Sequence, residues 1–125
     1  MPAKSYDLHG VRVMECEAGG KQLGSDRDAV DIIAEASPHR ASLVAIPTTR
    51  LGDDFFRLST RIAGEVIQRF LMYGMRVAIV GDISRYVDES NALRDFVIES
   101  NRGEHVWFVE NQEELGQRLR IRNSQ

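Results

Sequence analysis

The positions of apolar residues predict an alternation of short strands and amphipathic helices. Three short runs, at 43–46, 77–80 and 106–109, are continuously apolar, which is typical of strands buried on both faces of a sheet. The longest helix is predicted over about 60–73, because apolar residues recur there with the spacing of one helix face. That face contains Ile62, Ala63, Val66, Ile67, Phe70 and Leu71.

The segment before the first apolar run predicts a hairpin and a helix. Residues 4–16 carry apolar and polar side chains in alternation around a turn at residues 9–10, a pattern typical of two short strands. Ser25 and Asp28 have the spacing of a capping box, with Asp in the place of Glu, and predict the start of a helix. Pro38 is expected to end that helix.

The segment after the second apolar run predicts a loop and two more helices. Residues 84–89 are mostly polar and indicate a loop. Ser90 can cap the helix that follows, and Gly103 is expected to end it in a left-handed conformation. Asn111 and Glu114 have the spacing of a capping box for the last helix.

These elements predict the order β-β-α-β-α-β-α-β-α. The fold class is therefore α/β, with a single-layer mixed sheet of about five strands and four helices. Right-handed crossovers place the intervening helices against the sheet, and the first hairpin adds an edge to it. The chain has no linker long enough to separate two units, so residues 1–125 are predicted to form one domain.

Composition narrows the class of protein. The chain is 42% hydrophobic and 28% charged, as in ordinary soluble domains, and its net charge of −3 argues against a nucleic-acid surface. No apolar run approaches the roughly 20 residues of a membrane span, and the N-terminus lacks the apolar core of a signal peptide. Cys16 is the single cysteine, which fits a reducing compartment. We therefore expect a cytoplasmic protein that binds neither membrane nor nucleic acid.

Two consecutive aromatic residues precede the longest predicted helix, in the run Asp53-Asp54-Phe55-Phe56. Successive side chains of a strand point to opposite faces, so a strand could not bury both rings in one core. A loop or a single helical turn could bury both as a lid on the sheet. If one ring is exposed instead, it marks a contact surface.

Two hydroxyl residues, Ser59 and Thr60, lie where the cap of the helix belongs. Their ordinary role is N-capping, which is worth about 1 kcal/mol. The alternative is that one of them carries a phosphate, because free N–H groups and the helix dipole favour an anion at a helix N-terminus.

Within the helix, Gly64 costs about 1 kcal/mol relative to Ala. It must be tolerated either for close packing or for access by a ligand or partner. Glu65 lies four residues from both Arg61 and Arg69, a spacing typical of surface ion pairs.

Acidic residues follow the buried strands. Asp82 lies directly after the second apolar run, at the rim where α/β sheets bind ligands, and Asp54, Glu99 and Asn101 could converge there. Paired carboxylates can perform acid–base chemistry or hold a divalent cation. The three histidines lack metal-ligand spacing and no catalytic triad can be recognised, so neither a metal nor another cofactor is expected.

Several phrases resemble a known bacterial family. DDFFRLST, AGEVIQRFLMYG, RVAIVGDIS and LRDFVIESNRGEHVWFV look like the domain of unknown function numbered 4180, and the resemblance covers nearly the whole chain. The family pattern has Gly at the place of Arg61 and Asn at the place of Met72. The resemblance implies no activity.

The element order is also similar to that of anti-sigma-factor-antagonist (STAS/SpoIIAA-like) domains. Some of these domains carry a regulatory phosphorylated Ser or Thr at the start of the helix after the central strand, and Ser59 and Thr60 fall at the matching place. Their Asp-Ser-Ser-Gly motif is absent, since Leu58-Ser59-Thr60-Arg61 stands there.

Three functional hypotheses follow. The leading hypothesis is a non-enzymatic regulatory or protein-interaction module that binds a partner through Phe55, Phe56 and the exposed edge of the 60–73 helix. The second is self-association through the same helix. The alternative is a small-ligand or enzymatic site built from Asp54, Glu65, Gln68, Asp82 and Glu99.

Overall fold

The computed structural model describes residues 3–123, with side chains described for residues 3–121. One five-stranded sheet runs through the domain in the order β1-β2-β3-β4-β5, and only the β1–β2 pair is antiparallel. The strands are β1 Lys4–Leu8, β2 Val11–Glu15, β3 Leu43–Pro47, β4 Arg76–Val80 and β5 Val106–Val109. The predicted α/β class, with five strands and a leading hairpin at the edge, is confirmed.

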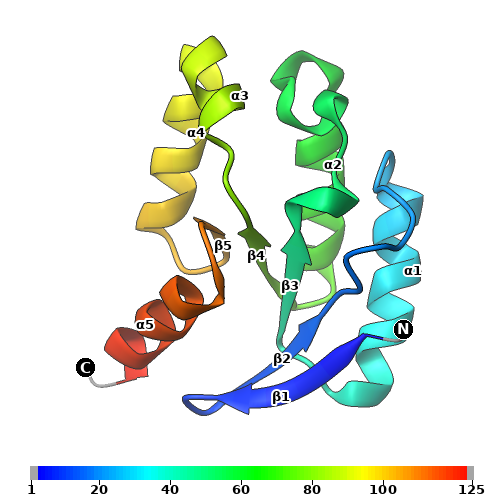
Figure 1. Cartoon of the computed structure of the whole chain (residues 1–125). Helices are drawn as coiled ribbons and strands as arrows, with labels where there is room; N and C mark the ends of the chain where they lie inside the picture. The colour runs from blue at the N-terminus through cyan, green and yellow to red at the C-terminus, as the bar shows by residue number, and fades with distance from the viewer. Residues whose placement is uncertain (1–2, 124–125) are drawn as a thin grey trace.

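Five α-helices connect or follow the strands within the described residues. They are α1 Asp26–Ala36, α2 Ile62–Met72, α3 Ser84–Glu89, α4 Asn91–Arg102 and α5 Gln112–Asn123. Because the parallel strands lie side by side in chain order, right-handed crossovers put α1, α2 and α4 on the same face of the sheet. Figure 1 shows α1 and α2 lying side by side, with α3 and α4 near β5, at the other end of the sheet from α1.

The sheet separates two cores. The larger core contains the predicted face of α1, the buried side of α2 and Leu93 of α4. The smaller core lies on the other face, where Leu115 and Leu119 of α5 pack on the sheet, as their spacing predicted. The strand residues of this smaller core are Val13, Leu43, Ala45, Ala78, Trp107 and Val109.

The helix α3 replaces the loop that was predicted over residues 84–89. Its apolar residues Tyr86 and Val87 pack with Ile83 against the larger core. The carboxylate of Asp82 accepts a hydrogen bond from the Ser84 N–H at 2.9 Å, which satisfies a donor of the first turn. The mostly polar composition of residues 84–89 did not indicate this apolar side. The segment is helical because the larger core buries the apolar side of the helix.

The helix α2 begins at Ile62 rather than near Thr60. Before it, two 3₁₀ turns, η3 (Asp53–Phe56) and η4 (Leu58–Thr60), take up the chain. Arg61 then adopts a left-handed backbone with φ of 67°, a conformation that favours glycine. The glycine that the family resemblance has at this position is explained by that conformation.

The other predicted helix ends differ in how well they agree with the structure. Ser90 accepts from the Leu93 N–H at 3.1 Å, and Asn111 accepts from the Glu114 N–H at 2.9 Å, so both caps are confirmed. At α1 the box is incomplete, because Ser25 caps no N–H while the Asp28 carboxylate accepts from the Gly24 N–H.

The expected left-handed Gly103 is wrong, since its backbone is extended with φ of −90°. The carbonyl of Gly103 accepts a hydrogen bond from the indole N–H of Trp107 at 2.9 Å. This contact with the next strand directs the chain out of α4, so tertiary structure determines the conformation here.

Candidate functional site

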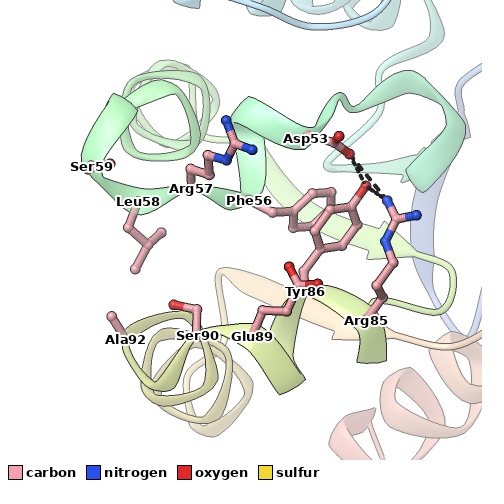
Figure 2. Close-up of a pocket in the computed structure, with 10 residues that line it drawn as sticks. All are labelled: Asp53, Phe56, Arg57, Leu58, Ser59, Arg85, Tyr86, Glu89, Ser90 and Ala92. Carbon is pink, nitrogen blue, oxygen red and sulfur yellow. Dashed lines mark hydrogen bonds and ion pairs between the residues drawn. The ribbon is translucent and has the colours of Figure 1, made fainter.

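A cleft opens at the carboxyl edge of the sheet, between the segments that follow β3 and β4. Its volume is about 590 Å³. In Figure 2 the two 3₁₀ turns form one side, and α3 with the start of α4 forms the other. The lining residues are Asp53, Phe56, Arg57, Leu58, Ser59, Arg85, Tyr86, Glu89, Ser90 and Ala92. Binding sites of α/β sheets are commonly found at this edge.

Aromatic stacking joins the two sides of the cleft. The ring of Phe56 stacks on the ring of Tyr86, with centroids 4.3 Å apart and planes 13° from parallel. Phe55 meets Phe56 edge to face at 5.2 Å. Phe55 and Phe56 are only 2% and 3% exposed, so the expected contact surface of exposed phenylalanines is wrong. A tight 3₁₀ turn can bury consecutive side chains, as the alternative of a lid on the sheet required.

A polar network covers this stack. The Tyr86 hydroxyl donates to Oδ1 of Asp53 at 2.6 Å, and Nη2 of Arg85 donates to the same oxygen at 3.2 Å. Arg85 also donates to the Tyr86 hydroxyl oxygen at 2.6 Å, and its guanidinium lies over the Tyr86 ring. Figure 2 shows these contacts reaching from α3 to η3.

The network changes the acidity of its members. The hydrogen bond to Asp53 is the main cause that raises the pKa of Tyr86, and the hydrogen bond with Tyr86 raises the pKa of Arg85. Tyr86 is therefore neutral and Arg85 charged at physiological pH. Reasoning from sequence missed both residues because it placed them in a loop, although the spacing of Ile83, Tyr86 and Val87 could have indicated a helix.

The hydroxyl residues Ser59 and Thr60 lie on η4. Thr60 Oγ1 donates to the carbonyls of Asp54 and Arg57 and accepts from the Ile62 N–H at 3.3 Å. Thr60 therefore supports the two turns and the start of α2. Ser59 is exposed and lines the cleft.

The acidic residues that could have converged lie apart. Asp54 lines a separate cavity and pairs with Arg57 at 3.3 Å. Asp82 lines another cavity, and the hydrogen bond from the Ser84 backbone lowers its pKa. Glu99 pairs with Arg102 at 3.6 Å on the surface of α4.

Asn101 has a structural role on β5. Its side-chain oxygen accepts from the Phe108 N–H at 2.7 Å, and its side-chain N–H donates to the Phe108 carbonyl at 3.2 Å. These bonds occupy backbone groups of a strand that ends the sheet. An edge strand with occupied backbone groups is protected from pairing with another chain.

The remaining candidates lie on the outer side of α2. Glu65 and Gln68 are exposed, and Arg69 pairs with Asp26 of α1 at 2.6 Å instead of extending a ladder along its own helix. A Cβ placed on Gly64 would meet no atom within 4 Å, so close packing does not explain this glycine.

Two kinds of chemistry find no support in the described residues. No group of three or more His, Cys, Asp or Glu side chains there could hold a metal ion. Burial raises the pKa of Cys16 to about 12, so its thiol stays protonated at neutral pH and is a poor nucleophile.

Among the helices of the same described part, none is both long and apolar enough to cross a membrane.

The family model called Domain of unknown function (DUF4180) matches residues 8–119. The chain belongs to this family. The matched part of the DUF4180 domain contains β2 to β5, α1 to α4 and every residue that lines the cleft. No curated protein and no solved structure matches the chain. The family resemblance is thus confirmed, whereas similarity to anti-sigma-factor-antagonist domains stays a prediction.

Proposed function

We propose that this DUF4180 domain is a non-enzymatic regulatory module that binds a protein partner through the cleft at the carboxyl edge. The observation that carries the proposal is the lining of this open, 590 Å³ cleft. Arginine and tyrosine, two of the three residue types most enriched at binding hot spots, occur beside apolar Leu58 and Ala92.

The charges of the cleft favour a polypeptide as the occupant. Arg57 and Arg85 balance Asp53 and Glu89, so the lining has no net charge at neutral pH. A phosphate-rich ligand would require an excess of basic groups. A segment that carries both signs of charge around an apolar side chain would complement both the arginines and the carboxylates.

The acidity of Tyr86 favours a binding role over a catalytic role for this side chain. A general acid or base works best when its pKa lies near the operating pH. The contact with Asp53 raises the pKa of Tyr86, which moves this group further from neutrality. The alternative of a site built from Asp54, Glu65, Gln68, Asp82 and Glu99 has less support, because these residues do not surround one cavity.

The compartment and the assembly state belong to the same proposal. A free, buried Cys16 fits the bacterial cytoplasm, which is reducing. Self-association through α2 is favoured by one observation: Met72 and Tyr73, at the end of this helix, are 63% and 57% exposed. Light scattering on the wild type and on a Met72→Glu, Tyr73→Glu double variant tests whether these side chains hold two copies together.

Site-specific photo-cross-linking tests the binding cleft. A photoreactive phenylalanine analogue is incorporated at Ser59, inside the cleft, or at Gln117, on the exposed side of α5. We expect a discrete adduct from position 59 in intact cells, and none from position 117. The same adduct from both positions, or none from position 59, contradicts the proposal.

Charge reversal then tests the cleft with the purified partner. Arg57→Glu should weaken binding at least ten-fold, whereas Arg102→Glu, on the surface of α4, should leave affinity unchanged. Equal affinities for the two variants would show that the partner binds elsewhere.

A further inference from the structure

A second cavity adjoins the cleft across the η3 turn. Its volume is about 460 Å³, and it lies between η3, the start of α2 and the segment 22–24 that precedes α1. It shares Asp53 and Arg57 with the cleft, so these two residues form a ridge between the two spaces. Figure 2 shows the cleft side of this ridge, where Leu58 points toward Ala92 and Arg57 points away from α4.

The two consecutive phenylalanines are divided between the two spaces. Phe56 lines the cleft only, and Phe55 lines the second cavity only. Their ring centroids are 5.2 Å apart and their planes meet at 73°, so the two apolar floors are adjacent but separate. Leu58 adds an apolar side chain to the cleft, and Ile62 adds one to the second cavity. Each space can therefore receive an apolar side chain of a ligand.

The spacing of the two floors matches a polypeptide. Along an extended chain, side chains i and i+2 point to the same side and are about 7 Å apart. On a helix, side chains three or four positions apart are separated by about 5–6 Å. Both forms can reach two floors that lie 5.2 Å apart, so the ridge between them decides which form fits.

The ridge favours the extended form, because it offers groups for backbone hydrogen bonds. Tyr86 and Arg85 both bind Oδ1 of Asp53, and a carboxylate can accept about four hydrogen bonds. Arg57 contacts Asp54 through Nη1 at 3.3 Å, and a guanidinium has several further N–H donors. An extended segment presents its own N–H and C=O groups to such partners, whereas those of a helix are bonded within the helix.

We propose that the partner binds as an extended segment that crosses this ridge and places one apolar side chain in each space. The inference rests on the proposed function of the cleft, and it adds the form of the partner and a second subsite. The backbone of the segment bonds to Asp53 and Arg57, and its two anchoring side chains lie on the Phe55 and Phe56 floors.

Cross-linking from both spaces tests the second subsite. The photoreactive analogue is placed in the full chain either at Ser59, which lines the cleft only, or at the exposed Gln22, which lines the second cavity only. Tandem mass spectrometry then locates the cross-linked residues of the partner. We expect adducts from both positions with the same protein, at residues within about six positions of each other, a span of about 20 Å in an extended chain.

A synthetic peptide with the cross-linked sequence tests the conformation and the contacts. Transferred NOEs of the bound peptide should be strong between each Hα and the next amide proton, as in an extended chain. Asp54→Lys, in the second cavity, and Glu89→Lys, in the cleft, should each weaken peptide binding at least ten-fold, because each puts a longer side chain of opposite charge at its subsite. Asp95→Lys, on the exposed side of α4, lines neither space and should bind as the wild type does.

Three results would overturn the inference and leave the proposed function intact: adducts from position 59 without any from position 22, adducts from the two positions on distant segments of the partner, or a helical NOE pattern. Unchanged peptide binding by Asp54→Lys beside weakened binding by Glu89→Lys has the same meaning. No adduct from position 59, or unchanged binding by Glu89→Lys, contradicts the inference and the partner-binding cleft together.

Discussion

Two regions of the molecule join separate segments through polar contacts. One is the corner between α4 and β5, where the contacts involve buried residues, and the other is the cleft at the carboxyl edge, where they involve exposed side chains. In the corner, Asn101 holds both backbone groups of the buried Phe108, and the buried Trp107 donates to the Gly103 carbonyl. Arg118 contacts this corner as well, where it lies over the Trp107 ring.

In the cleft, the corresponding contacts are made at the surface. The side chains of Asp53 and Arg85 are 66% and 70% exposed, and they meet the Tyr86 hydroxyl in solvent. Exposed ion pairs contribute roughly 0–1 kcal/mol, whereas a buried group left without its partner costs about 1–3 kcal/mol. Polar residues of the corner therefore stabilise the fold, whereas those of the cleft contribute little to its stability.

The backbone of the carboxyl edge around the cleft also differs from that of the corner. Arg61 and Gly81, which flank the cleft without lining it, have φ of 67° and 146°, whereas Gly103 in the corner has an ordinary extended backbone. Unfavourable backbone conformations concentrate at functional sites, where the surrounding structure must hold them. Four substitutions test this contrast, from the largest expected effect to the smallest.

Gly81→Ala should have the largest effect, because the side chain of Thr48 packs closely against this glycine. A Cβ at Gly81 would lie 2.3 Å from Oγ1 and 2.7 Å from Cγ2 of Thr48, and φ is positive there. We expect a loss of about 3 kcal/mol in the free energy of unfolding, measured by urea denaturation. Thr48→Ala removes both contacting atoms, so in the double variant it should recover part of the loss. Additive losses would show that contact with Thr48 is not the cause.

Asn101→Ala should follow, with a loss of about 2 kcal/mol, because the N–H and C=O groups of buried Phe108 lose their partners. Chemical denaturation measures the loss, and hydrogen exchange at the Phe108 amide should become faster. Asn91→Ala, at the exposed start of α4, is the control and should change stability by less than about 0.5 kcal/mol. A loss no larger than that of the control would remove the contrast between corner and cleft.

Arg61→Gly should stabilise the domain by about 1 kcal/mol, since a left-handed backbone costs a non-glycine residue roughly 1–2 kcal/mol and the greater freedom of unfolded glycine offsets part of the gain. The change in urea midpoint measures this. Arg57→Gly, which precedes the same turn with a negative φ, should destabilise instead. Destabilisation by Arg61→Gly would mean that the arginine side chain contributes more than its backbone conformation costs.

Tyr86→Phe should have the smallest effect on stability, about 0.5 kcal/mol or less, because the lost contacts are exposed. The network should appear more clearly in a pH titration of the Tyr86 ring by NMR. Its pKa lies above the usual value of 10.0, and Asp53→Asn should lower it by removing the charged acceptor.

The pH dependence of stability has a defined sign in this network. The folded state holds the Tyr86 proton more tightly than the unfolded state does. Its contribution is therefore complete below pH 10 and is lost as the pH rises through the folded pKa. An unchanged Tyr86 titration in Asp53→Asn would contradict the hydrogen bond as its cause.

The local pattern was sufficient for much of the fold. The buried strands, the inner faces of α1, α2 and α5 and the caps at Ser90 and Asn111 depend on side-chain periodicity and short-range hydrogen bonds. Both are properties of a few neighbouring residues. These strands, helix faces and caps could therefore be predicted from the sequence without knowledge of tertiary contacts.

The candidate site depended on contacts that sequence spacing does not show. Asp53 and Tyr86 are 33 residues apart in the chain, so their hydrogen bond follows only from the pairing of β3 with β4. The same pairing buries Phe56 against Tyr86 and thereby removes the contact surface expected from two adjacent phenylalanines.

By itself, then, the sequence determined the α/β class, the order of the strands along the chain, the family and the core-facing side of each long helix. Only the tertiary structure decided that residues 84–89 are helical, that Arg61 is left-handed and that Asn101 pairs with a strand edge. The physical reason is the range of the interactions: periodicity and caps act within a few residues. Packing against a core, by contrast, overrides local preference wherever distant segments meet.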